Sequence, residues 1–336
     1  MAQTKARLPW VDVARGYGIL AIILSHVLTG HPVSKWLFTF HVPLFFFLSG
    51  YLFRDGKAFS GFFKGKLRHL VLPYFSLGLC VVFAEALLQA GPEPFWSRAG
   101  SLFLGLVVQR RQWSLWFLPA LLLTELAGFW VIRLLRRRWC LALAGIALGA
   151  LGIGYRALGG PVLPWCLDAV LPMLPFFLAG YLIKTSGRDW EALAKSPKGV
   201  LAFFLLGAGN LAFGAPAILG LLPQLDVFSG SYGFPLLSYP GALCGSLCVV
   251  LVAIWWPARA LEYLGKNSML YFAWHQTPVL TAILLFFPML GIPVSGFSSG
   301  AAMLGEKGLE VLVILTLLTG ANALLSRSRL KWMLGK

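Results

Sequence analysis

Arg15 and His26 lie eleven positions apart within one apolar segment near the N-terminus. In an α-helix this spacing is about 20° beyond three full turns, so both side chains face the same way, separated by roughly 16 Å of rise. A histidine is the natural general base at neutral pH, and an arginine is suited to binding a phosphate. The pair therefore predicts a phosphate-binding residue near one helix end and a base deeper along the same face. A purely structural role is equally compatible with either residue taken alone.

The next apolar segment contains the same two residue types in reverse order, His41 and Arg54. Since successive spans run in opposite directions, we expect His41 at the depth of His26 and Arg54 at the depth of Arg15. An ideal helix places His41 and Arg54 about 220° apart, so they share one face only if Pro43 bends or starts the helix. This second pair is therefore weaker evidence than the first.

A third histidine, His275, lies about midway along a later apolar segment. Ser268 and Tyr271 precede it at helical spacing and share its face. Three histidines at similar depth could form a metal site, and this alternative stays open because their convergence cannot be read from sequence. No Cys or His spacing typical of a metal motif accompanies them. We therefore expect no metal ion and no tightly bound cofactor.

Two acidic residues, Glu85 and Glu125, also lie within apolar segments, where ionisable side chains are costly. Glu125 and Trp116 are candidates for binding an acceptor substrate, since an indole ring can stack on a sugar. Pairing of either glutamate with a neighbouring helix is the structural alternative. An aromatic belt at the membrane surface is the more conservative interpretation of Trp113 and Trp116.

The elements that position these residues follow from composition. Of the 336 residues, 58% are hydrophobic and only 12% are charged, against about 25% charged in a soluble domain. The net charge of +16 would suggest nucleic-acid binding in a soluble protein. Here the basic residues form short clusters between apolar runs, which indicates a membrane protein facing anionic lipid. We expect lipid, and no nucleic acid, as a partner.

The hydrophobic pattern predicts an all-α integral membrane protein, a bundle of about ten transmembrane helices. The fifth and sixth segments are short and could be tilted or partly re-entrant, and Ser101 to Val108 is a short interfacial candidate. A span needs roughly 20 mostly apolar residues. The predicted spans are 13–31, 37–54, 70–90, 115–133, 139–155, 169–184, 199–222, 238–257, 267–289 and 308–326.

The distribution of basic residues predicts the orientation. With the N-terminus in the cytoplasm and ten spans, 22 of the 28 Lys and Arg residues lie on the cytoplasmic side. Both termini are therefore expected in the cytoplasm. Residues 1–336 form a single membrane domain in this prediction, with no appended soluble domain and no internal repeat of the kind found in transporters.

The chain resembles the acyltransferase type 3 family of membrane O-acyltransferases, and within it the fucose 4-O-acetylase-like branch. Each matching motif is weak alone, but five in order on a ten-span frame are specific. The motifs are WVDVARGYGILAIILSHV from Trp10, FHVPLFFFLSGYLFR from Phe40, KLRHLVLPY from Lys66, LWFLPALLLTE from Leu115 and YLGKNSMLYFAWH from Tyr263.

This resemblance implies transfer of an acyl group, usually acetyl, from acetyl-coenzyme A to a hydroxyl of a carbohydrate or cell-envelope glycan. It matches the family's Arg-to-His spacing to Arg15 and His26, and its SGxxxR pattern to Ser49, Gly50 and Arg54. Arg15, Ser49 and Arg54 are then expected to bind the donor. It also implies a multi-pass protein of the bacterial cytoplasmic (inner) membrane.

In this interpretation His26 is the catalytic base, with Arg15, His41 and His275 as further catalytic candidates. Direct attack by the acceptor and a covalent acyl-histidine both remain open. Two other functions also stay open. A transporter or flippase for lipid-linked sugars would share the many spans and the buried charge, and a scaffold protein would need neither Arg15 nor His26.

Overall fold

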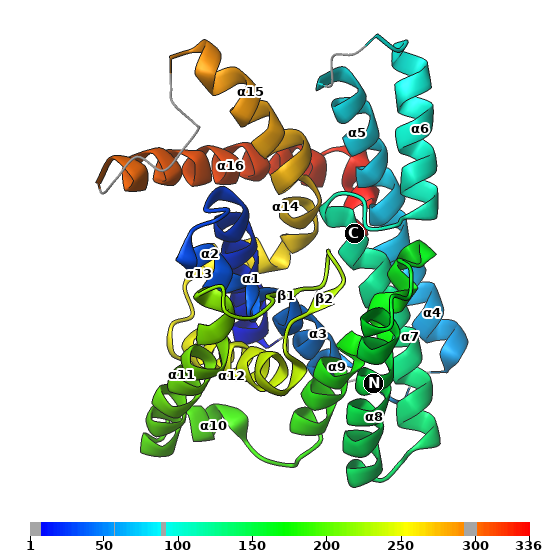
Figure 1. The fold of residues 1–336 in the computed structure, drawn as a ribbon. Helices are drawn as coiled ribbons and strands as arrows, with labels where there is room; N and C mark the ends of the chain where they lie inside the picture. Colours follow the sequence, from blue (N-terminus) through cyan, green and yellow to red (C-terminus); the bar gives the residue numbers. More distant parts are fainter. Residues whose placement is uncertain (1–7, 57, 89–91, 292–300) are drawn as a thin grey trace.

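A computed structural model describes residues 8–56, 58–88, 92–291 and 301–336. The described chain is almost entirely helical, apart from one antiparallel hairpin formed by β1 (Leu225–Asp226) and β2 (Ser231–Tyr232) (Figure 1). Together with the apolar helices described below, this arrangement confirms the prediction of an all-α membrane protein.

The helices follow one another along the chain with few long connections. They are α1 (Pro9–Val27), α2 (Pro32–Phe38), α3 (His41–Leu52), α4 (Phe59–Lys66), α5 (Leu72–Leu88), α6 (Phe95–Val108), α7 (Phe117–Leu134), α8 (Arg138–Ala157), α9 (Val170–Lys184), α10 (Trp190–Ala194), α11 (Pro197–Ile218), α12 (Pro235–Trp255), α13 (Arg259–Lys266), α14 (Ser268–Trp274), α15 (Thr281–Met289) and α16 (Ala301–Arg327). Shorter turns join some of them: the π-helical η1 (Leu67–Val71) and η4 (His275–Leu280), and the 3-10 helices η2 (Ser114–Trp116), η3 (Pro164–Ala169) and η5 (Arg329–Leu334).

Nine helical stretches in the described part of the chain are long and apolar enough to cross a membrane. They correspond to nine of the ten predicted spans. The fifth and sixth predicted spans, expected to be short, belong to stretches of 20 and 21 residues, Arg138–Ala157 and Pro164–Lys184. The interfacial candidate at Ser101 to Val108 is the second half of α6, which packs against α5.

The predicted span at 37–54 is wrong as a single helix. The chain breaks at Thr39–Phe40, between the seven-residue α2 and the twelve-residue α3. Twelve residues rise only roughly 18 Å, less than the ~30 Å of a bilayer core. Pro43 lies in the first turn of α3, where its missing N–H leaves no hydrogen bond unmade, so proline here favours a helix start.

Helices α1 and α3 occupy the interior of the bundle. In the most apolar stretch of α1, 72% of the residues are buried, against 11% in that of α11, so α1 is central and α11 is peripheral. α1 packs along α13, and α3 packs along α9. Both contacts depend on glycine: a Cβ on Gly50 would overlap the Phe177 carbonyl, and a Cβ on Gly265 would overlap the Asp12 carbonyl. Gly50 thus permits the close approach of α3 and α9.

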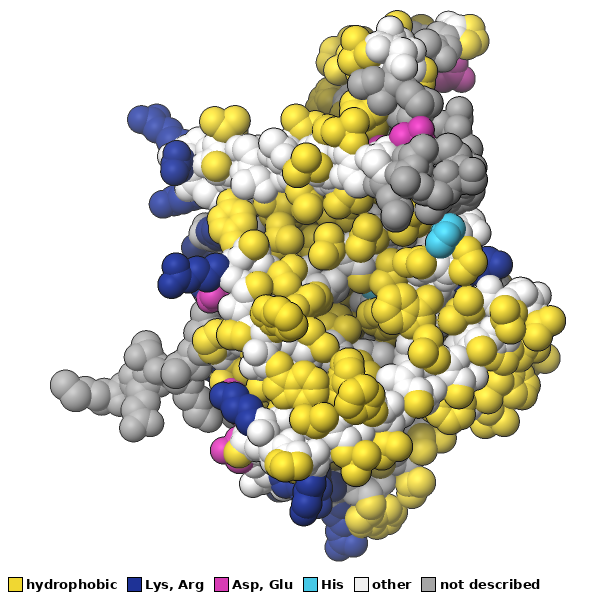
Figure 2. All heavy atoms as spheres, turned by 90° about the vertical axis from the view of Figure 1, so that its left-hand side faces the viewer, with side chains coloured by type: hydrophobic (Ala, Val, Ile, Leu, Met, Phe, Trp, Pro, Cys, Tyr) yellow, Lys and Arg dark blue, Asp and Glu magenta, His cyan; other side chains and the backbone are white. Residues whose placement is uncertain are grey.

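The surface is that of a protein surrounded by lipid. Figure 2 shows a broad apolar face with Lys and Arg gathered mainly along its margins. Large apolar side chains such as Ile146 and Leu205 are 68% and 64% exposed. Such a face would be unstable in water, so it fits a multi-pass membrane protein.

Candidate active site

Two of the cavities that α1 lines separate the arginines from the histidines. Arg15 lines one, called here the arginine cavity, and His26 lines the other, the histidine cavity. Helix α3 repeats this division, with His41 in the histidine cavity and Arg54, just past its end, in the arginine cavity. The two depths inferred from the alternation of spans are therefore present in the structure.

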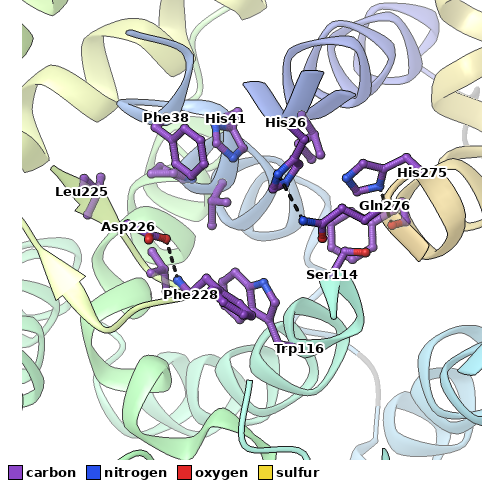
Figure 3. A pocket seen from close by; sticks show the side chains of 15 residues that line it. His26, Phe38, His41, Ser114, Trp116, Leu225, Asp226, Phe228, His275 and Gln276 are labelled. Carbon is purple, nitrogen blue, oxygen red and sulfur yellow. Dashed lines mark hydrogen bonds between the residues drawn. The ribbon is translucent and has the colours of Figure 1, made fainter. Parts of the chain in front are cut away.

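The histidine cavity brings together His26, His41 and His275 from α1, α3 and η4 (Figure 3). The rings of His26 and His275 are the nearer pair, with centroids 5.1 Å apart. The cavity volume is about 100 Å³, which is several times the ~15 Å³ that a single water requires. There is thus room for a small reacting group beside the imidazoles.

Backbone carbonyls orient two of the three rings. His41 Nδ1 lies 2.8 Å from the Leu37 carbonyl, and His275 Nδ1 lies 2.9 Å from the Phe272 carbonyl. A carbonyl only accepts, so Nδ1 must donate in each ring, and the neutral imidazole keeps its lone pair on Nε2. His275 Nε2 is buried and has no hydrogen-bond partner among the described residues. It is therefore available to a group that enters the cavity.

Gln276 orients the third ring, and sequence analysis missed it. Its side-chain Nε2 lies 3.3 Å from His26 Nδ1. A side-chain amide can offer either an N–H or a carbonyl oxygen, so it can hold an imidazole in either protonation state. His275 and Gln276 both line the cavity, and they lie just before the kink at Thr277, where the backbone is not helical. The feature of the sequence that points to Gln276 is a polar amide side chain inside an apolar segment.

The opposite wall of the histidine cavity comes from η2 and the hairpin. Trp116 and Phe228 lie here with ring centroids 6.3 Å apart, and Asp226 lies beside them. The predicted acceptor-binding residue Trp116 thus shares a cavity with the histidines. Sequence analysis missed Asp226, because it belongs to a short connection between spans and the search for buried charge covered only the spans.

A buried ion pair holds this hairpin. Arg111 is paired with Asp168, and its guanidinium also donates to the carbonyls of Val227 and Phe228. The Tyr232 hydroxyl donates to the Asp168 carbonyl at 3.3 Å. Burial raises the pKa of Tyr232 to about 12, so this phenol stays protonated and remains a donor. Removal of one partner from such a buried pair is strongly destabilising.

The arginine cavity contains all three predicted donor-binding residues, Arg15, Ser49 and Arg54. Lys66 and His69, from α4 and η1, also line it. Its volume is about 270 Å³, larger than that of the histidine cavity. Two guanidinium groups and an ammonium around one cavity make it cationic, which suits a ligand that carries phosphates.

Glu125 lies in the arginine cavity and not beside Trp116. It pairs with Lys66 at 2.6 Å and accepts a hydrogen bond from Ser49. Trp116 and Glu125 are nine residues apart along continuous helix, or roughly 13 Å. Their acceptor-binding roles remain predictions, but the structure assigns the two residues to different cavities. Glu85 accepts a hydrogen bond from Trp113 and lines neither cavity.

Metal binding was the alternative use of the histidines. Within residues 8–56, 58–88, 92–291 and 301–336, no group of three His, Cys, Asp or Glu side chains is arranged to hold a metal ion. The five cysteines are all free thiols.

Comparison with known proteins identifies the family. The family model described as an acyltransferase domain matches residues 8–321, nearly the whole chain. No curated protein and no solved structure matches the chain. The family assignment therefore rests on the match to this model, which includes both cavities. The chain belongs to the acyltransferase 3 family and is a membrane acyltransferase.

Proposed function

We propose that the protein transfers an acetyl group from acetyl-coenzyme A to a hydroxyl of a carbohydrate or cell-envelope glycan in the bacterial inner membrane. One observation carries this proposal: a cationic cavity and a histidine cavity lie along the same two helices, α1 and α3. A donor with phosphates at one end and a thioester at the other would occupy both.

The arginine cavity is the proposed site for the phosphates of the donor. Arg15 and Arg54 would contact them, and the Ser49 hydroxyl would donate to a phosphate oxygen in place of Glu125. With the N-terminus in the cytoplasm, as the basic residues predict, this cavity opens toward the pool of acetyl-coenzyme A. The pantetheine arm then extends into the bundle toward His26, roughly 16 Å further along α1.

The proposed chemistry takes place in the histidine cavity. With the Gln276 amide turned so that its carbonyl oxygen accepts from His26 Nδ1–H, the lone pair of the ring lies on Nε2, which takes the proton of the acceptor hydroxyl. The acceptor oxygen attacks the thioester carbonyl and forms the new ester bond. The carbon–sulfur bond breaks, and coenzyme A leaves as a thiolate that takes the proton back from the imidazolium. His41 and His275 offer Nε2 atoms that can accept a hydrogen bond from the acceptor hydroxyl.

The test is release of coenzyme A by the purified protein in detergent, supplied with acetyl-coenzyme A and cell-envelope glycans. Glycan-dependent release that is lost in folded His26→Ala and Arg15→Ala proteins supports the proposal. Undiminished release from His26→Ala would leave an enzyme but remove His26 as its base. Absence of release with every glycan fraction would favour the transporter alternative.

A further inference from the structure

The hairpin is the only strand pair in the described chain, and it forms the wall that faces the histidines. Residues 225–228 all line the histidine cavity, and Asp226 is the one carboxylate among its described lining residues (Figure 3). An acidic side chain beside three imidazoles needs a physical reason, since it plays no part in the chemistry proposed above.

The position of Asp226 is fixed by the structure around it. Arg111, only 6% exposed, donates to the carbonyls of the two residues that follow Asp226. Ser231 donates to the Gln224 carbonyl at 2.7 Å and closes the other side of the hairpin. Because these contacts hold the backbone on both sides, Asp226 is a pre-organised group rather than part of a free loop.

The carboxylate itself is only partly engaged. Asp226 Oδ1 accepts a hydrogen bond from the Phe228 N–H at 3.1 Å. A carboxylate has about four acceptor positions, so others remain for a ligand. Asp226 and His26 line the same cavity. A group bound by Asp226 would therefore lie near the imidazole that activates the acceptor.

We propose that Asp226 binds the acceptor, by accepting hydrogen bonds from hydroxyls adjacent to the one that is acylated. This inference rests on the proposed function and narrows its acceptor to a polyhydroxylated ring. Trp116 and Phe228 supply the apolar surface on which such a ring packs, and the carboxylate supplies the acceptors that its hydroxyls require. A simple alcohol would use the aromatic wall but have no second hydroxyl for Asp226.

The test separates acceptor binding from chemistry. Oligosaccharides released from bacterial cell envelopes are titrated calorimetrically into the full-length protein in lipid nanodiscs, without donor. We expect Asp226→Asn to weaken binding about tenfold or more, because a charged group with two accepting oxygens becomes a neutral amide with one. Asp226→Glu, which retains the carboxylate, should recover part of the affinity. Glu191→Gln, on α10 and in neither cavity, removes an acidic charge as the matched control.

Absence of oligosaccharide binding by the wild type, or equal affinity of Asp226→Asn and wild type, would overturn the inference. If binding depends on Asp226 while no protein releases coenzyme A, the acyl-transfer proposal fails and acceptor binding stands.

Discussion

The arginine and histidine cavities are built on the same helices but satisfy their polar groups in opposite ways. In the arginine cavity the buried Glu125 is paired with Lys66 and bonded to Ser49. In the histidine cavity the buried Nε2 of His275 has no partner among the described residues. The ion pair compensates the buried charge of Glu125. A buried imidazole nitrogen without a hydrogen-bond partner, in contrast, costs free energy unless a ligand binds it.

This difference separates recognition from chemistry. A cationic cavity with compensating acid can bind a polyanion without changing any protonation state. The histidine cavity offers neutral nitrogens that can gain and lose a proton. If the two cavities have these separate roles, substitutions in one should alter donor binding and substitutions in the other should alter turnover.

The largest effect is expected from His26→Ala. Loss of a general base typically costs about 10²- to 10⁴-fold in rate, so kcat should fall by that factor while the affinity for acetyl-coenzyme A changes little. Turnover and donor binding are measured separately on the purified protein. His31→Asn is the control, since asparagine keeps an acceptor for the Val33 N–H. A large loss of donor affinity in His26→Ala would contradict the separation.

The next largest effect is expected from Arg54→Ala, and it should appear in KM rather than in kcat. A charged hydrogen bond contributes about 1.5–3 kcal/mol, so the KM for acetyl-coenzyme A should rise roughly tenfold to a hundredfold with kcat nearly unchanged. Arg188→Ala, at an exposed position outside both cavities, is the control. A fall in kcat at unchanged KM would place Arg54 in the chemistry instead.

Gly50→Ala tests whether the close packing of α3 against α9 holds the two cavities at a fixed separation. The new methyl group would overlap the Phe177 carbonyl, so we expect a loss of about 1–3 kcal/mol in stability and a lower melting temperature. Gly61→Ala, in α4 with open space around it, should not be destabilised. Equal melting temperatures of the two variants would show that the α3–α9 contact can adjust to the added methyl group.

The smallest effect is expected from Gln276→Leu. This change removes one hydrogen bond to His26 at nearly constant size, a loss of about 1 kcal/mol and hence about fivefold in kcat. Gln276→Glu, which keeps an acceptor but no donor, shows which protonation state of the ring the amide supports. A KM effect without a kcat effect would mean that Gln276 contacts substrate rather than His26.

Periodicity and spacing predicted much of this arrangement. The eleven-residue separation of Arg15 and His26 placed both on one face of α1, and each lines a cavity there. The alternation of spans placed His41 and Arg54 at the matching depths. The pattern was wrong for 37–54, because hydropathy averages over the break that Pro43 and the short α2 impose.

The remaining site residues depend on contacts that spacing does not encode. Asp226 reaches the histidines only because Arg111, more than a hundred positions earlier, holds the hairpin. Gln276 lies at the point where the helical segment kinks, just before the non-helical Thr277, a break that spacing does not reveal. Glu125 was predicted to bind the acceptor because it is an acidic residue inside an apolar segment, whereas the helical rise from Trp116 places it in the other cavity.

The short helix α3 has a consequence for which donors the protein can use. It contributes His41 at its first residue and Ser49 three residues before its end, so its length sets the separation of the two cavities. A helix is a stiff spacer: His41 and Ser49 are eight residues apart on α3, roughly 12 Å of rise, and Arg15 and His26 are roughly 16 Å apart on α1. Under the proposed function, a carrier is accepted only if its thioester lies roughly 12–16 Å from its phosphates. A compact activated donor such as acetyl phosphate would bind at the arginines and never reach the imidazoles, so the enzyme would select its donor by length.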